Sequence, residues 1–333
     1  MDRIEDTISA ILNGLAADET QDYCDFTLEE QNEASAAKGI TPCVSSDYVP
    51  LVKSTVTYIV IGVLMNEEGE ILMMQEAKSS CYGQWYLPAG RVEPGEEIEE
   101  AVKREVLEET GIIMEPKSLL LVETASGSWF RFVIVGDSIG GELKTPDKSD
   151  DESLQAQWVK DVEKLCLRSS DIVPIIERAR AYNKSPPEPW HGKILPVIKG
   201  HQKLLLRLLV CIKKRSNNRV HILLSEKNDI HLPLCEINPR KSLHSILKTF
   251  MTEIFGADVA PHKPHGVLSV EFSGRPEGIN DGVCLTILVS FRKPLEEVGI
   301  IDKYTWLEVS ETLGNEILNK LPKNMVTPLN VIR

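Results

Sequence analysis

The sequence predicts an α+β fold that occurs twice along the chain. Apolar, β-branched runs alternate with turn residues, a long amphipathic helix follows them, and the order lacks βαβ regularity. The chain has 333 residues, enough for two domains of ordinary size. Its composition, 42% hydrophobic and 26% charged, is typical of a globular protein with a buried core.

The first 50 residues predict an N-terminal helix and a flexible acidic tether. Apolar residues recur at helical spacing at Ile4, Ile8, Ile11, Leu12 and Leu15. Residues 17–45 are polar, acidic and poor in large apolar groups, which is typical of a flexible segment. We expect the helix to dock either on a partner or on its own domain.

Residues 51–184 contain the elements expected of the first domain. Two apolar runs flank the turn Asn66-Glu67-Glu68-Gly69 and predict a hairpin. Gly111 stands where helices usually end. In order, the expected elements are strands at 56–64 and 71–74, a helix at 96–110, strands at 129–135 and 155–160, and a helix at 171–182.

A proline-rich linker at 185–194 separates this domain from a second one at 195–333. An offset of 145 residues pairs Leu87-Pro88 with Leu232-Pro233 and Gly111 with Gly256. Apolar positions of the long helix follow the same offset, which predicts an internal repeat.

The composition argues against several classes of partner. A net charge of −13 disfavours duplex nucleic acid, and no apolar run is long enough to span a membrane. The start of the chain lacks the pattern of a signal peptide. Seven scattered cysteines without a Cys-x-x-Cys pair favour free thiols. We expect a cytoplasmic location, or one shared with the nucleus.

An acidic face interrupts the long helix. Ile98 and Val102 begin an inward stripe that continues into Glu105 and Glu109, with Glu108 at its edge. Carboxylates at this spacing repel each other, and burial costs several kcal/mol per ion unless something compensates. A divalent cation such as Mg²⁺ compensates for both effects. A solvated acidic face is the alternative.

The region around these acids has a defined motif: Gly, five residues, Glu, seven residues, then Arg-Glu-apolar-any-Glu-Glu-any-Gly-apolar, from Gly90 to Ile112. This motif resembles the Nudix box at every defined position. The resemblance implies a mixed β-sheet sandwiched between helices, with the box forming loop, helix and loop. It also implies hydrolysis of phosphoanhydrides with Mg²⁺, for which Mn²⁺ could substitute.

The resemblance further implies roles for individual residues. The implied metal ligands are the carbonyl of Gly90 and the side chains of Glu105, Glu108 and Glu109. Glu96 would orient the loop, and Arg104 would brace a catalytic glutamate. Glu152 is a candidate for an additional acid from a later loop, or is one more acid in a solvated run. Glu105 or Glu152 would accept the proton from the attacking water.

Longer stretches resemble one branch of this family, the phosphatases of 8-oxo-guanine nucleoside diphosphates. The similar stretches are 75–78, 83–91, 128–132, 152–156 and 281–285. On this resemblance the products are 8-oxo-dGMP and phosphate, which would sanitise the nucleotide pool. The alternatives are a pyrophosphatase of ADP-ribose, a dinucleotide or capped RNA, and a non-catalytic nucleotide sensor.

Four residues are candidates for substrate binding. Trp129 and Phe130 could stack on a base, Arg131 could bind a phosphate, and Asp171 could hydrogen-bond a base. The alternatives are that the aromatic side chains belong to the core of a strand and that Asp171 is a helix N-cap.

The second domain lacks the catalytic set. Cys235, Lys241, Thr249, Phe250 and Ile254 stand at the positions of Gly90, Glu96, Arg104, Glu105 and Glu109. We therefore expect a degenerate Nudix-like domain that covers the active-site mouth, forms a homodimer or binds a protein partner.

Overall fold

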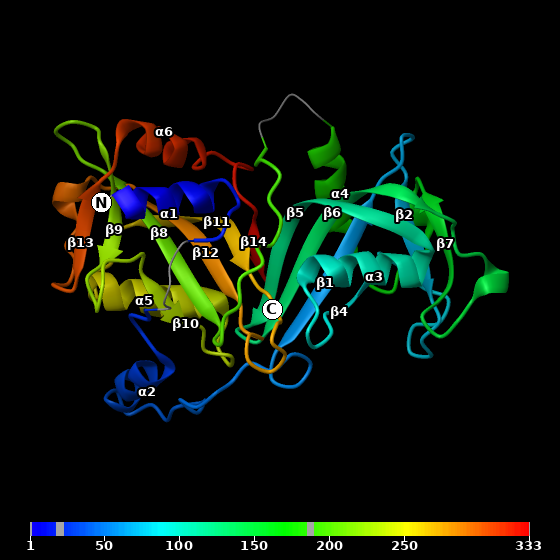
Figure 1. Cartoon of the computed structure of the whole chain (residues 1–333), viewed down its shortest axis with the longest axis horizontal. Helices are drawn as coiled ribbons and strands as arrows, with labels where there is room; N and C mark the ends of the chain where they lie inside the picture. The colour runs from blue at the N-terminus through cyan, green and yellow to red at the C-terminus, as the bar shows by residue number, and fades with distance from the viewer. Residues whose placement is uncertain (1, 18–22, 185–189, 333) are drawn as a thin grey trace.

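The computed structural model describes residues 2–17, 23–184 and 190–332, and Figure 1 shows two α/β halves side by side along the long axis. The elements of the first half are β1 (Thr57–Leu64), β2 (Ile71–Glu76), β3 (Trp85–Tyr86), β4 (Ala89–Arg91), α3 (Ile98–Thr110), β5 (Ile112–Ser126), β6 (Trp129–Gly141), β7 (Ser153–Val159) and α4 (Ile172–Asn183). The elements of the second half are β8 (Leu205–Lys213), β9 (Val220–Ser225), β10 (Leu234–Glu236), α5 (Leu243–Phe255), β11 (His262–Glu271), β12 (Cys284–Phe291), β13 (Tyr304–Glu308) and α6 (Glu311–Asn319). The chain also forms α1 (Asp2–Leu12), α2 (Leu28–Ala36) and β14 (Leu329–Val331).

The first half has a mixed sheet between two helices, as expected. Its main sheet has the order β14-β5-β6-β1-β4, and β2 lies between β3 and β7 in a smaller sheet. Strand β1 is central because both of its faces are buried. Val60 packs in the core that includes Val102 of α3, and its neighbour Ile61 packs in the core that includes Ile175 of α4.

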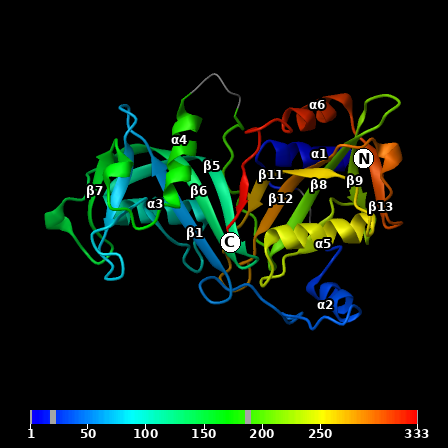
Figure 2. The ribbon, with the colours of Figure 1, turned by 180° about the vertical axis from the view of Figure 1, so that it is seen from behind.

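The second half repeats this topology. In each half the first strand pairs parallel with the penultimate one and antiparallel with the short strand before the helix: β1 with β6 and β4, and β8 with β12 and β10. The offset of 145 residues superimposes the bounds of β4 on β10 and those of α3 on α5. The internal repeat expected from the sequence is therefore present in the fold. Figure 2 shows α5 along one face of the second sheet, while α1 and α6 pack together on the other.

The expected hairpin between the first two strands is wrong in part. A turn does join them, since the Asn66 amide donates to the Glu70 carbonyl at 3.1 Å. However, β1 and β2 enter different sheets and share only an isolated bridge, Met65 to Ile71. The apolar runs define two strands but not their partners, and β1 pairs with β4 and β6 instead.

The segment expected to be a flexible tether forms ordered structure within the described residues 23–48. Thr27 caps α2 through a capping box with Glu30. Asp25 and Phe26 are buried against β10, where Phe26 bridges Cys235 and the Asp25 amide donates to Leu234. Composition alone misses such a segment because one buried aromatic ring and a capped helix are sufficient to anchor it.

The two halves pack against each other through a common hydrophobic core, and both ends of the chain take part in the fold. Helix α1 packs on the second half, whereas β14 near the C-terminus pairs parallel with β5 of the first half. The expected linker falls partly on residues 185–189, which lie outside the described residues. Of its remainder, Ile194 is buried and accepts a hydrogen bond from the Leu119 amide at 2.6 Å. The domain limits expected from the sequence stay a prediction.

A buried tyrosine tests this contact between the halves. Tyr58 is fully buried, stacks edge-on against Phe272 and donates to the Asp281 carbonyl at 2.8 Å. Tyr58→Phe should lower the free energy of unfolding by about 1 kcal/mol, because it removes this hydrogen bond. Urea unfolding measures the change, with the exposed Tyr82→Phe as control. Equal stability of the two variants would contradict the importance of this contact.

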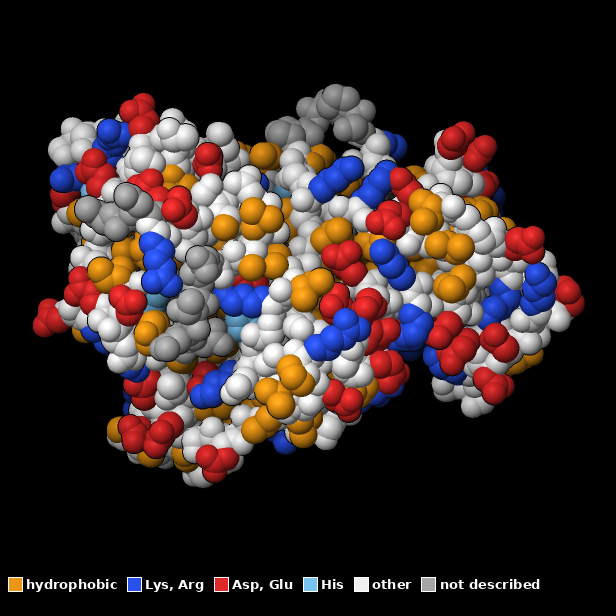
Figure 3. Space-filling view, viewed as in Figure 1, with side chains coloured by type: hydrophobic (Ala, Val, Ile, Leu, Met, Phe, Trp, Pro, Cys, Tyr) orange, Lys and Arg blue, Asp and Glu red, His pale blue; other side chains and the backbone are white. Residues whose placement is uncertain are grey.

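The distribution of charged side chains on the surface and the length of the helices bear on possible partners. On the face in Figure 3, Asp and Glu side chains spread over both halves with Lys and Arg side chains interspersed. Among the described residues, no helix is long and apolar enough to cross a membrane.

Candidate active site

Helix α3 and the loop before it form the scaffold of the site. The helix begins after Glu97, whose amide donates to the carboxylate of Glu100 at 2.9 Å. It ends at Gly111, which has a φ of 76°. A Cβ atom there would lie 2.1 Å from the Glu142 carbonyl, so glycine is required for both conformation and space. The expected helix over 96–110 is confirmed within two residues.

Gly90 and Glu105 approach each other closely. Gly90 lies on β4 opposite Val60, and a Cβ atom built on it would lie 2.0 Å from the Glu105 carboxylate. Glu105 is only 8% exposed. Burial, together with the charges of Glu108 and Glu152, raises the pKa of Glu105 although Arg104 opposes the shift.

Glu109 is buried one helical turn further along. It is 1% exposed, and its Oε2 accepts a hydrogen bond from the Ala89 amide at 2.8 Å. Burial and the nearby charge of Glu105 keep the pKa of Glu109 well above its ordinary value, despite that hydrogen bond. The expected inward acidic stripe is therefore present: Glu105 and Glu109 are buried, and Glu108 is exposed at its edge.

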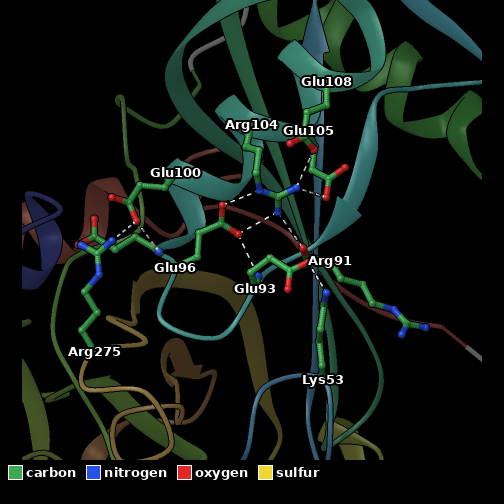
Figure 4. Close-up of polar contacts among 10 residues, drawn as sticks. Lys53, Arg91, Glu93, Glu96, Glu100, Arg104, Glu105, Glu108 and Arg275 are labelled. Carbon is green, nitrogen blue, oxygen red and sulfur yellow. Dashed lines mark hydrogen bonds and ion pairs between the residues drawn. The ribbon is translucent and has the colours of Figure 1, made fainter. Parts of the chain in front are cut away.

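Arg104 connects the acids of the loop and the helix (Figure 4). Its guanidinium contacts both oxygens of Glu96 at 2.7 and 2.9 Å. Through Nη1 it also donates to Glu105 at 2.8 Å and to Glu108 at 3.1 Å. Glu96 in turn accepts from the Glu93 amide at 2.9 Å, so it fixes the loop. These contacts agree with the positions expected for Glu96 and Arg104.

The donor set suits a hard divalent cation. The carbonyl of Gly90 and the three helix carboxylates offer only oxygen ligands, which Mg²⁺ and Mn²⁺ prefer. Gly90 passes directly against the Glu105 carboxylate, and burial is the main cause of the raised pKa values of Glu105 and Glu109. Their ionised forms are therefore costly here, and a bound cation would offset that cost. Arg104 donates to Glu105 and Glu108, and the Ala89 amide donates to Glu109. A different group of possible metal ligands is more tightly clustered in the described ranges. His201, Glu271 and Cys284 have ligand atoms within 4.8 Å of one another.

A cleft with a volume of about 980 Å³ opens beside the box. Of the residues expected from the sequence, the cleft is lined by Gly90, Arg104, Glu105, Glu108, Trp129, Arg131, Glu152 and Asp171. Four further basic residues line it that sequence reasoning missed: Lys53, Lys78, Arg91 and Arg168. Arg91 could have been found from its place beside Gly90. The other three come from separate segments, and no local pattern distinguishes them.

Phe130 is not a candidate base platform, which corrects the expectation. It is fully buried and packs against Tyr58 with ring centroids 5.7 Å apart. Successive side chains of a strand point to opposite faces, so Trp129 and Arg131 face the cleft while Phe130 faces the core.

Arg131 and Asp171 form an internal pair rather than two independent contacts. Arg131 is 6% exposed and lies between Glu123, 2.5 Å away, and Asp171, 2.6 Å away. Tyr86 donates to Asp171 at 3.0 Å. Burial alone would raise the pKa of Asp171, but hydrogen bonds from Arg131, Ser169 and Tyr86 lower it. Asp171 occupies the N-cap position of α4, but its side chain makes no capping hydrogen bond.

The positions that match Glu105 and Glu109 form core in the second half, as expected, whereas Lys241 is half-buried and Thr249 is exposed. Cys235, Phe250 and Ile254 are fully buried. Phe250 stacks with Phe26 from the N-terminal segment, with ring centroids 6.5 Å apart. The place of the acidic stripe is thus taken by apolar packing.

Comparisons with known proteins agree with this geometry. A family model described as the NUDIX domain matches residues 56–171. The 8-oxo-dGDP phosphatase NUDT18 of Danio rerio is 36% identical over 289 residues, which cover 83% of this chain and 88% of that protein. NUDT18 of Homo sapiens is 35% identical over 295 residues, which cover 84% of this chain and 88% of that protein. An ADP-ribose pyrophosphatase of Methanocaldococcus jannaschii is 38% identical over 94 residues, which cover 27% of this chain and 56% of that protein.

Proposed function

The chain belongs to the Nudix family, and from this premise we propose that it hydrolyses oxidised purine nucleoside diphosphates. The substrates are 8-oxo-dGDP, 8-oxo-GDP and similar nucleotides, and the products are the monophosphate and phosphate. The activity would remove oxidised nucleotides from the pool. The observation that carries this proposal is the buried acidic stripe beside Gly90, which opens onto a cleft with basic residues.

Two kinds of group share the reaction. Glu105, Glu108, Glu109 and the carbonyl of Gly90 would hold a divalent cation, for which we propose Mg²⁺ with Mn²⁺ as a substitute. When bound, the cation neutralises phosphate oxygens and activates water. Glu105 or Glu152 accepts the proton of the attacking water, and both face the same cleft. Lys78 and Arg91 also line it and are suited to the diphosphate.

Trp129 is the candidate stacking platform for the base. It lines the cleft, and the guanidinium of Arg131 lies 5.8 Å from its ring centroid. Asp171, held by Arg131 and Tyr86, presents a carboxylate in the same cleft that can accept hydrogen bonds from a base edge. The position of Arg131 between two acids supports a role in holding Asp171 more than direct contact with phosphate.

Trp129→Ala tests this assignment. Base stacking contributes about 1–3 kcal/mol, so KM for 8-oxo-dGDP should rise roughly ten- to hundredfold while kcat changes much less. Steady-state kinetics measure both values, with the exposed Tyr82→Ala as control. An unchanged KM would exclude Trp129 as the platform.

One screen decides between the proposed function and its alternatives. Purified protein is incubated with oxidised and normal nucleoside di- and triphosphates, and with ADP-ribose, in Mg²⁺ and in Mn²⁺. Phosphate released from 8-oxo-dGDP supports the proposal. Two nucleotide-type fragments from ADP-ribose would support a pyrophosphatase, the activity named for the archaeal relative. Binding without turnover of any substrate would support a sensor.

We also propose a cytoplasmic location, or one shared with the nucleus, because the seven cysteines are free thiols and disulfides are rare in both compartments. A homodimer or a protein partner bound through the second half remains a prediction, which light scattering of the purified protein can test.

A further inference from the structure

A loop of the second half lies against the loop of the Nudix box. Arg275 reaches across from this loop, which spans residues 273–281 (Figure 4). Its Nε donates to the Gly95 carbonyl at 2.8 Å. Its two terminal nitrogens donate to Glu97 at 3.1 Å and to Glu100 at 2.6 Å. One guanidinium therefore holds the box loop and the first turn of α3 together.

The backbones of the two loops also meet directly. A Cβ atom at Gly274 would lie 2.7 Å from the Glu96 carbonyl, and Gly274 has a φ of +67°. Only glycine therefore allows the two chains to pass this closely. The contact concerns Glu96, the residue whose side chain holds Arg104.

The loop that carries Arg275 is itself firmly anchored. Asn280 donates to the Arg275 carbonyl at 2.7 Å. Asp281 is 2% exposed and accepts from the amides of Gly278 and Val52 at 3.0 and 2.8 Å. Its carbonyl accepts from the Tyr58 hydroxyl at the start of β1. Arg275 thus extends from a loop whose base is bonded to the first half.

We propose that Arg275 is a positioning residue. Through the loop 273–281, the second half holds in place the box loop before α3, which carries Gly95 and Glu96. The path runs from Arg275 to the carbonyl of Gly95, from Gly274 to the backbone of Glu96, and from the Glu96 side chain to Arg104. Arg104 then aligns Glu105 and Glu108, which it contacts directly. This inference rests on the proposed function. It gives the degenerate repeat a role that needs no catalytic residue of its own.

If Arg275 served only to stabilise the fold, its removal would lower the unfolding midpoint, whereas a positioning role predicts a different result. Arg275 is half exposed, and exposed ion pairs add little to the free energy of unfolding. Its removal should therefore leave the unfolding midpoint unchanged but loosen the geometry at the metal ligands. Small errors in such geometry reduce turnover strongly.

The experiment compares Arg275→Ala and Arg275→Lys with Arg219→Ala in the full-length protein. Arg219 is the matched control, because it is a partly exposed arginine of the second half that pairs with Glu308 and Glu311 away from the cleft. Arg275→Ala should lower kcat about tenfold and raise the metal concentration for half-maximal activity, with KM within about twofold of the original. Arg275→Lys should recover part of kcat, because lysine keeps the positive charge but cannot make all three hydrogen bonds of the guanidinium.

Two measurements without substrate separate this inference from the proposed function. Amide hydrogen exchange across residues 93–100 should accelerate in Arg275→Ala but not in Arg219→Ala. Binding of Mn²⁺ alone should weaken in the same variant. If the unmodified protein hydrolyses no nucleotide, the proposed function fails, while exchange and Mn²⁺ binding still decide on Arg275. Unchanged exchange, or unchanged Mn²⁺ binding and kcat, would overturn the inference.

Discussion

Glu109→Gln is expected to remove nearly all hydrolysis while leaving the fold intact. The glutamine side chain is nearly isosteric and can still accept the hydrogen bond from the Ala89 amide. It cannot contribute the charge that a divalent cation requires. Loss of several kcal/mol of transition-state stabilisation by the metal corresponds to a fall in kcat of about 10³-fold.

The raised pKa of Glu109 also predicts the direction in which this substitution changes the stability of the fold. The pKa of Glu109 is raised on folding above its ordinary value of 4.5. Such a group contributes stability that is complete below pH 4.5 and is lost as the pH rises through the folded-state pKa. The neutral glutamine keeps that contribution at pH 7. Without metal, Glu109→Gln should therefore unfold at the same temperature as the unmodified protein or at a higher one.

Thermal unfolding with and without Mg²⁺ and nucleotide measures both effects. Ligand binding to the folded state should stabilise the unmodified protein and not the variant. Glu99→Gln is the matched control, because Glu99 lies on the same helix and burial also raises its pKa, but it is not among the proposed metal ligands. Undiminished turnover in Glu109→Gln would refute the assignment of the metal site.

Gly90→Ala is expected to have the second largest effect. The added methyl group would lie 2.0 Å from the carboxylate of Glu105, so either β4 or Glu105 must move. Both are proposed to hold the cation, and a displacement of about 1 Å can reduce turnover about 10²-fold. The half-saturating concentration of Mn²⁺ should rise in parallel.

Gly299→Ala is the matched control for this substitution. A Cβ atom at Gly299 meets nothing within 4 Å, and its φ lies outside the left-handed region. Metal titration and steady-state kinetics of both variants measure the difference. If Gly90→Ala binds Mn²⁺ and turns over substrate like Gly299→Ala, the close contact with Glu105 has no catalytic importance.

Much of the site was predictable from local sequence, because the interactions that shape it join residues a few positions apart on one helix. The period of the helix places Glu105 and Glu109 on the buried side and Glu108 at the edge, and Gly111 ends the helix. The contacts of Arg104 with Glu108 and Glu105 are also short-range. The repeat was detectable because the offset of 145 residues preserves apolar positions that both cores need.

Other features depended on pairings between distant segments, which no local pattern encodes. Phe130 and Trp129 are adjacent, but only the pairing of β6 with β1 decides which one faces the cleft. Arg131 contacts Glu123 because of the register between β5 and β6, and it contacts Asp171 because of the placement of α4.

The sequence by itself determined the acidic stripe, the glycine that ends its helix and the repeated order of elements, since helical period, backbone conformation and apolar spacing act over a few residues. Only the tertiary structure decided that 23–36 docks on the second half, that β1 and β2 separate, and that Arg275 reaches the box loop. Those outcomes depend on which surfaces bury each other, and burial is a property of the whole chain.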